Sequence, residues 1–128
     1  MDDLIRTRIR RVTIILTCLG IIFATALLLM PVMGNGVARI PDKLAHALLF
    51  SGVALPTLIL PARRWAWVIA GLAVYGGTIE LVQPYFGREA SLLDWLANLA
   101  GLAMAIAIAP ILRRGLVWVT TPRRHQTE

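Results

Sequence analysis

Four apolar runs, each long enough to cross a lipid bilayer as a helix, constrain the fold of this chain more than any other feature. The first run, residues 12–33, contains no charged side chain. At 1.5 Å per residue it forms about 33 Å of helix, enough for a hydrocarbon core of roughly 30 Å. The other runs are 44–60, 65–83 and 92–112, and the only acidic, basic or imidazole side chains in them are His46, Glu80 and Asp94.

We therefore predict an all-α, polytopic membrane protein with four transmembrane helices in a compact bundle. The expected helices are 12–33, 43–60, 64–83 and 92–112, and basic tails, 1–11 and 113–128, flank them. The composition agrees, since 58% of the residues are apolar and 16% are charged, against roughly 45–50% and 25% in soluble domains. The 128 residues are expected to form a single domain.

Lys and Arg residues are distributed unevenly between the two ends of this bundle. Short cytoplasmic segments collect positive charge, so the basic end is expected to face the cytoplasm, with both termini there. The basic charge then indicates orientation and attraction to anionic lipids, and nucleic-acid binding is not expected. Ten basic residues lie at the end with the termini: Arg6, Arg8, Arg10, Arg11, Arg63, Arg64, Arg113, Arg114, Arg123 and Arg124. Three lie at the other: Arg39, Lys43 and Arg88.

The first run has an alternative interpretation as a signal peptide, because a basic segment precedes it. Its apolar stretch exceeds the usual 7–15 residues, so a retained helix is favoured. Cys18 is the only cysteine, which excludes a disulfide scaffold.

Polar side chains within the apolar runs gather near the end that carries few basic residues. Asp42 and His46 are four residues apart and share a helix face, as do Asp94 and Asn98. We expect these faces to point into the bundle, because a charge that faces lipid is costly. The candidate ligand-binding residues are Asp42, Lys43, His46, Glu80, Gln83, Arg88, Asp94 and Asn98.

Purely structural roles remain open for several of these residues. Asp42 follows Pro41 and is a candidate helix N-cap. Asp94 completes a capping-box pattern with Ser91. Glu80 and Arg88 are candidates for a structural ion pair, and Asn98 for a hydrogen bond between helices.

Glycine and tryptophan residues are expected to have structural roles. Gly71, Gly76, Gly77 and Gly101 are predicted to be helix-packing positions. Trp65, Trp67, Trp95 and Trp118 are predicted to anchor the helices at the membrane interfaces.

Lys43 suggests an anionic ligand. A cation in the first turn of a helix opposes the helix dipole, and a carboxylate or bound anion would offset that cost. The N-termini of the second and fourth helices emerge on this same side. Together with Lys43 and Arg88, they are suited to holding a phosphate or carboxylate group.

Three motifs occur in order along residues 41 to about 105: Pro41-Asp42-Lys43-x-x-His46-x-x-x-Phe50, Tyr75-Gly76-x-x-x-Glu80-x-x-Gln83 and Gly87-Arg88-x-x-Ser91-x-x-Asp94-x-x-x-Asn98-x-x-Gly101. Together they resemble the VanZ-like family of small bacterial membrane proteins. A departure from the family pattern is Ala105, where members often have a glycine. The resemblance implies the bacterial cytoplasmic (inner) membrane and a cell-envelope role, in a family named for a member that lowers susceptibility to teicoplanin.

Three functions follow as hypotheses. The first is a non-enzymatic protein whose outer polar cluster binds a lipid-linked phosphate, a cell-wall precursor or a partner protein, with an effect on glycopeptide susceptibility. The second is an enzyme for a lipid-linked phosphate, with His46 as acid/base, Asp42 orienting it and Glu80 assisting proton transfer. The third is a small transporter subunit with a proton relay through Glu80 and His46.

No cofactor or metal is predicted, because the spacing matches no recognised metal signature. A site built from Asp42, His46, Glu80 and Asp94 would suit Mg²⁺ or Mn²⁺ better than Zn²⁺, since one imidazole stands among carboxylates. The oligomeric state does not follow from the sequence.

Overall fold

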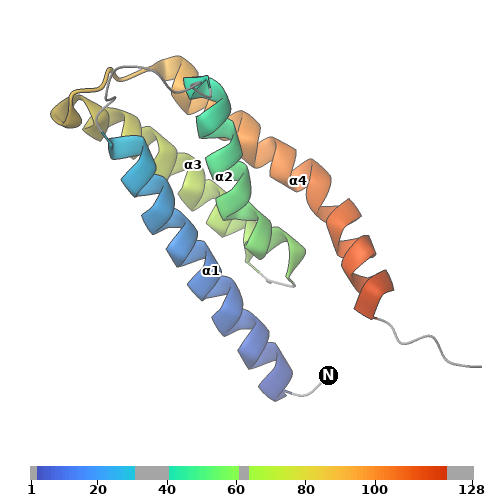
Figure 1. Ribbon diagram of the computed structural model, residues 1–128. Coiled ribbons are helices and arrows are strands. Elements are labelled where there is room, and N and C mark those ends of the chain that lie inside the picture. The colour runs from blue at the N-terminus through green and yellow to red at the C-terminus, as the bar shows by residue number, and fades with distance from the viewer. Residues whose placement is uncertain (1–2, 31–40, 61–63, 121–128) are drawn as a thin grey trace, which may run out of the picture.

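The computed structural model describes residues 3–30, 41–60 and 64–120, and within the last range the side chains up to residue 116. All regular structure in these ranges is helical (Figure 1). Four helices are long and apolar enough to cross a membrane, which confirms that part of the prediction. The elements are α1 (Asp3–Leu29), α2 (Asp42–Ile59), α3 (Trp65–Val82), the 3₁₀ helix η1 (Gln83–Phe86) and α4 (Leu92–Thr120).

Two helices extend beyond the apolar runs that predicted them. Helix α1 begins at Asp3 instead of residue 12, and α4 continues to Thr120 instead of residue 112. Much of the predicted basic tails is therefore helical. An uncharged run marks only the part of a helix suited to hydrocarbon, whereas arginine favours helix and lets it continue into the polar region. The expected end of the first helix, 31–33, lies outside the described residues.

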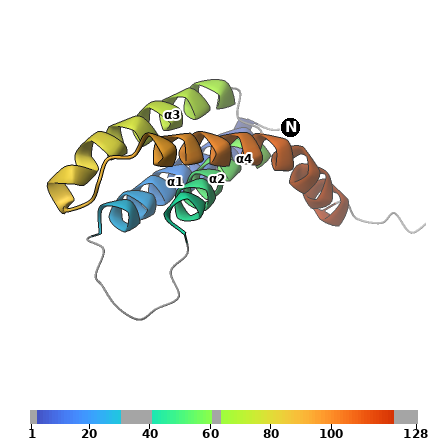
Figure 2. The ribbon, with the colours of Figure 1, turned by 90° about the horizontal axis from the view of Figure 1, so that it is seen from above.

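The helices run alternately up and down, so the start of α1 and the end of α4 lie at the same end of the molecule (Figure 1). The most extensive interface joins α2 to α4, and α2 also packs against α1 and α3. Figure 2 shows α1 and α2 side by side. Helix α4 packs against α2 and α3. The starts of α2 and α4 and the end of α3 therefore meet at the end opposite the two termini.

The distribution of polarity is the reverse of that in a soluble protein. Large apolar side chains face outward on every long helix, for example Ile22 on α1 and Leu81 on α3. Inside, polar groups such as His46 and Asn98 are buried beside apolar ones such as Phe50. This arrangement suits a lipid solvent, in which polar groups are satisfied within the protein.

Close helix contact at the α2–α4 interface depends on Gly101. A Cβ atom at this position would overlap the backbone of Ala47, whose carbonyl carbon and Cα would lie 2.8 and 2.9 Å away. Gly76 and Gly77 also face neighbouring side chains, as expected for packing positions. The prediction for Gly71 is wrong, because a Cβ there would meet nothing within 4 Å.

Trp95 has a different role from the predicted interfacial anchor. Its indole is partly buried, and Nε1 donates a hydrogen bond of 3.0 Å to the carbonyl oxygen of Ala73 on α3. Trp65 and Trp67 are exposed in the first turn of α3, and Trp118 lies outside the described side chains.

We predict that Gly101→Ala destabilises the protein by about 1–3 kcal/mol, because the added methyl forces α2 and α4 apart. Thermal unfolding in detergent, followed by circular dichroism, measures the effect. Gly71→Ala is the matched control and should not lower the unfolding midpoint, because a methyl there meets nothing within 4 Å and alanine favours helix. Equal midpoints for the two variants would contradict the role assigned to Gly101.

Candidate functional site

The predicted site residues come together where α2, α3 and α4 meet, at the end opposite the termini. We call seven of them the polar cluster, because ion pairs and hydrogen bonds link them in pairs around a common centre. The eighth candidate, Gln83, is turned toward α1. The polar cluster comprises Asp42, Lys43, His46, Glu80, Arg88, Asp94 and Asn98.

His46 lies at the centre of the polar cluster and is fully buried. Its Nδ1 is 2.9 Å from Oδ1 of Asn98 on α4 and 3.5 Å from Oε1 of Glu80 on α3. Two acceptor oxygens facing one ring nitrogen assign the proton to Nδ1. In the neutral imidazole Nε2 then carries a lone pair, and this buried atom makes no hydrogen bond with the described residues.

The predicted interhelical hydrogen bond of Asn98 is thus confirmed, and its partner is the imidazole of His46. The expectation that Asp42 orients His46 is wrong, because the hydrogen bond that orients the ring joins Nδ1 of His46 to Asn98. Asp42 and His46 do share one face of α2, as their spacing predicted, and one atom of each lies within 4.8 Å of the other.

Glu80 joins α3 to the beginning of α4. Its Oε2 accepts a hydrogen bond of 3.2 Å from the backbone N–H of Ser91. In a capping box the side chain of Asp94 would take that amide, so the capping role suggested for Asp94 is not observed. A carboxylate from α3 serves the start of α4 instead, where it also suits the helix dipole.

Asp42 and Arg88 form the outer edge of the polar cluster. Nη2 of Arg88 lies 2.6 and 2.7 Å from the two carboxylate oxygens of Asp42. Asp42 is therefore not an N-cap, because Pro41 occupies that position without a side-chain cap bond. The suggested pair between Arg88 and Glu80 is not formed, since the guanidinium ion-pairs with Asp42.

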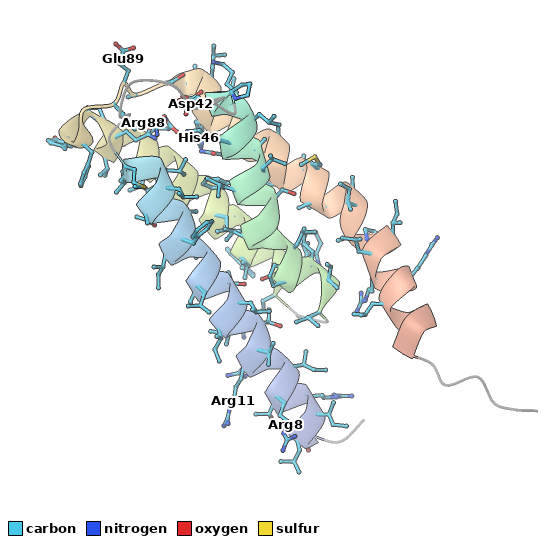
Figure 3. The ribbon with its side chains drawn as sticks, viewed as in Figure 1. Arg8, Arg11, Asp42, His46, Arg88 and Glu89 are labelled. Carbon is cyan, nitrogen blue, oxygen red and sulfur yellow. The ribbon has the colours of Figure 1, made fainter. Side chains whose placement is uncertain are left out.

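The segment after η1 directs Arg88 back toward the bundle. Gly87 has a φ of +74°, a left-handed conformation that favours glycine, and the N–H of Arg88 donates to the carbonyl of Gln83. Figure 3 shows Arg88 close to Asp42 and His46, whereas Glu89 points away from them.

Lys43 is loosely held. Its Nζ lies 3.8 Å from Oδ1 of Asp94, and its side chain is 60% exposed, whereas that of Asp94 is 8% exposed. The pair is an ion pair without a hydrogen bond, and Oδ1 of Asp94 is buried with no hydrogen-bond donor among the described residues.

Gln83 ties the end of α3 to α1. It is buried, and its Nε2 donates a hydrogen bond of 3.1 Å to the carbonyl oxygen of Leu28, in the last turn of α1. The last carbonyls of a helix commonly need partners from outside the helix, so the contact is structural.

A hydroxyl pair that the sequence did not single out links α1 to α3. Oγ1 of Thr25 lies 2.6 Å from the hydroxyl of Tyr75, and the Tyr75 ring stacks on Phe50 with 5.7 Å between centroids. Thr17 and Thr57 make a similar contact of 3.2 Å between α1 and α2. Threonine and tyrosine are common in apolar helices, so residue type alone does not predict which of them make contacts between helices. A prediction of how the helices pack would be needed to pair them.

The interior of the polar cluster has more hydrogen-bond acceptors than donors. Three of its buried atoms that make no hydrogen bond are acceptors, on His46, Glu80 and Asp94, and one is a donor, Nδ2 of Asn98. Asp42, His46 and Asp94 each place one ligand atom within 4.8 Å of the others. The cluster is therefore suited to a proton donor or a cation at its centre, and its exposed cation, Lys43, to an anion at its edge.

No protein-family profile, curated protein or solved structure matches this chain.

We predict that Asn98→Leu lowers the free energy of unfolding by about 1–2 kcal/mol, because Nδ1 of His46 loses its acceptor in a buried setting. Chemical unfolding in mixed micelles measures the change. Thr78→Val is the control, since the Thr78 hydroxyl is exposed and bonds only within α3. If Asn98→Leu were as stable as the control, the hydrogen bond would not hold the helices together.

Proposed function

We propose that this chain is a multi-pass protein of the bacterial cytoplasmic membrane, with both termini in the cytoplasm. Its polar cluster, on the extracytoplasmic side, binds an anionic lipid-linked or cell-wall-related ligand. The four apolar helices support a membrane location. The uneven distribution of basic residues supports the orientation, and the resemblance to the VanZ-like family supports the bacterial envelope. An effect on glycopeptide susceptibility is part of the same proposal.

The observation that carries the ligand proposal is the state of Lys43. Its ammonium is largely exposed at the first turn of α2, and it lies 3.8 Å from Asp94, beyond hydrogen-bond distance. The ammonium has three N–H donors, and its ion pair with Asp94 is long. Lys43 is therefore able to turn toward a phosphate or carboxylate with little loss of interaction free energy. Arg88, by contrast, is engaged by Asp42 with short contacts.

The surroundings of Lys43 suit a lipid. Leu44 and Leu48 follow it along α2, and both are about half exposed. Leu92 and Leu96 are exposed near the start of α4. A lipid whose head group contacts Lys43 would find apolar side chains for its chain on the same helices.

The enzyme hypothesis has weaker support. His46 is fully buried, so a substrate would reach Nε2 only after the polar cluster opened. Ser91 carries a hydroxyl immediately before α4, and its backbone N–H is bound to Glu80. No described residue combines an accessible nucleophile with a base at hydrogen-bond distance.

The transporter hypothesis also has weaker support. A proton relay needs titratable groups along its path. Away from the polar cluster, the buried polar residues that the structure describes within the bundle are serine and threonine, together with Gln83 at its edge. These groups include no carboxylate or imidazole between the polar cluster and the end with the termini.

We predict that reporter fusions placed after Arg39 and after Arg88 give an extracytoplasmic signal, and that a fusion after Arg114 gives a cytoplasmic one. The charge distribution between the two ends is the physical reason. Paired alkaline phosphatase and green fluorescent protein fusions make the measurement. Cytoplasmic signals after both Arg39 and Arg88 would refute the orientation.

We predict that Lys43→Gln weakens binding of a polyprenyl phosphate about fivefold, because one cation near a membrane surface contributes about 1 kcal/mol toward an anion. Native mass spectrometry of the full chain, released from neutral detergent with added polyprenyl phosphate, measures occupancy. Arg11→Gln is the matched control, since Arg11 lies at the opposite end of the bundle (Figure 3). Equal losses in both variants, or none in Lys43→Gln, would contradict the proposed ligand site.

A further inference from the structure

The geometry points to a divalent-cation site formed by Asp42, His46 and Asp94. This inference goes beyond the proposed function and does not rest on it, because the site is defined without any lipid. Asp42 and His46 come from the first two turns of α2, and Asp94 comes from the first turn of α4.

The three ligand atoms are already close together. One atom from each residue, a ring nitrogen of His46 and a carboxylate oxygen of each aspartate, lies within 4.8 Å of the other two. A metal ion about 2.0–2.3 Å from nitrogen and oxygen ligands places those ligands roughly 3–4 Å apart. A small rotation of the side chains would therefore bring all three into one coordination sphere.

Independent support comes from buried lone pairs that no hydrogen-bond donor in the described structure satisfies. Nε2 of His46 and Oδ1 of Asp94 are both buried and make no hydrogen bond. His46 is 0% exposed and Asp94 5% exposed. Leaving such groups without a hydrogen bond costs free energy, and a cation bound by these two atoms would remove that cost.

The orientation of His46 prepares it as a ligand. Asn98 accepts the proton of Nδ1 at 2.9 Å, which leaves Nε2 as the nitrogen with a free lone pair. Metal-binding histidines commonly donate their other ring N–H to a carbonyl or carboxylate in this way. Asn98 and Glu80 would thus act as outer partners that fix the ring.

The charges of the polar cluster also favour a cation. Three carboxylates, from Asp42, Glu80 and Asp94, face two permanently basic side chains, Lys43 and Arg88. In a setting of low dielectric, an uncompensated negative charge attracts a positive ion strongly.

Neither nearby cation blocks the site. Lys43 is mostly exposed and lies 3.8 Å from Asp94, so its ammonium can move into solvent as the ion enters. Nη2 of Arg88 contacts both carboxylate oxygens of Asp42, but a carboxylate has about four lone-pair positions, so acceptor sites remain. Asp42 is therefore able to bridge Arg88 and the metal.

The ligand set indicates the class of ion. One imidazole with two carboxylates combines a ligand preferred by transition metals with ligands preferred by Mg²⁺ and Mn²⁺. Mn²⁺ accepts both kinds of ligand and is the probe of choice. Water molecules would complete its coordination on the side of Asp42, whose side chain is 54% exposed.

The test is a Mn²⁺ titration of the purified full chain in neutral detergent, with free Mn²⁺ counted by electron paramagnetic resonance. We expect saturable binding of one ion per chain. Asp94→Asn, which keeps the shape of the side chain, should weaken binding at least about tenfold. Glu89→Gln is the matched control, because Glu89 is an exposed carboxylate at the same end that points away from the cluster (Figure 3).

A spectroscopic readout on the unaltered protein keeps the inference testable even if Asp94→Asn does not fold. Electron spin-echo modulation of the bound Mn²⁺ should show coupling to an imidazole nitrogen, and His46→Gln should abolish it. Absence of saturable binding up to ~1 mM, absence of the nitrogen coupling, or equal weakening by Glu89→Gln and Asp94→Asn would each overturn the site. None of these measurements includes a lipid phosphate, so a negative result for Mn²⁺ would not contradict the proposed lipid ligand, which the Lys43→Gln experiment tests.

Discussion

Hydrogen bonding between buried polar groups is the constraint on which the rest of this structure depends. In a lipid solvent, a polar side chain cannot form hydrogen bonds with water, so it forms them with groups on other helices. The contact between His46 and Asn98 meets that requirement across α2 and α4. Glu80 meets it by accepting the N–H of Ser91, which fixes the end of α3 against the start of α4.

Close backbone contact makes these hydrogen bonds feasible. Gly101 allows α4 to approach the backbone of Ala47 on α2, one residue after His46 and one turn beyond Asn98. A larger residue would separate the two helices just where the imidazole must reach the amide. Packing and polarity are therefore two aspects of one interface, and a change in either one alters the other.

The sequence predicted the helices and the membership of the polar cluster well, because both follow from simple periodicity and from the cost of facing lipid with charge. Shared faces were correct for Asp42 with His46, and the interhelical role of Asn98 was correct. The pairing of individual groups was harder to predict. Arg88 pairs with Asp42 and not with Glu80, because the turn at Gly87 determines where the guanidinium points.

The ends of the helices and the hydroxyl contacts between helices could also not be predicted from the sequence. An uncharged run shows where hydrocarbon can surround a helix, whereas α1 and α4 continue through charged residues that are good helix formers. The contact between Thr25 and Tyr75 depends on the rotation of α1 against α3. Such rotations are set by packing as a whole and leave no local pattern.

The length of α1 has a consequence for how the protein sits in a bilayer. Its 27 residues extend about 40 Å, roughly 10 Å more than the hydrocarbon core. At about 100° per residue, Arg6, Arg8, Arg10 and Arg11 are spread over about 200° of the circumference of the helix. Arginine side chains of this kind extend toward the head groups, so they help to set the depth of α1 in the bilayer. Gln83 joins the other end of α1 to the start of η1. A change in bilayer thickness that shifts α1 along its axis would therefore also displace η1, which lies beside the polar cluster.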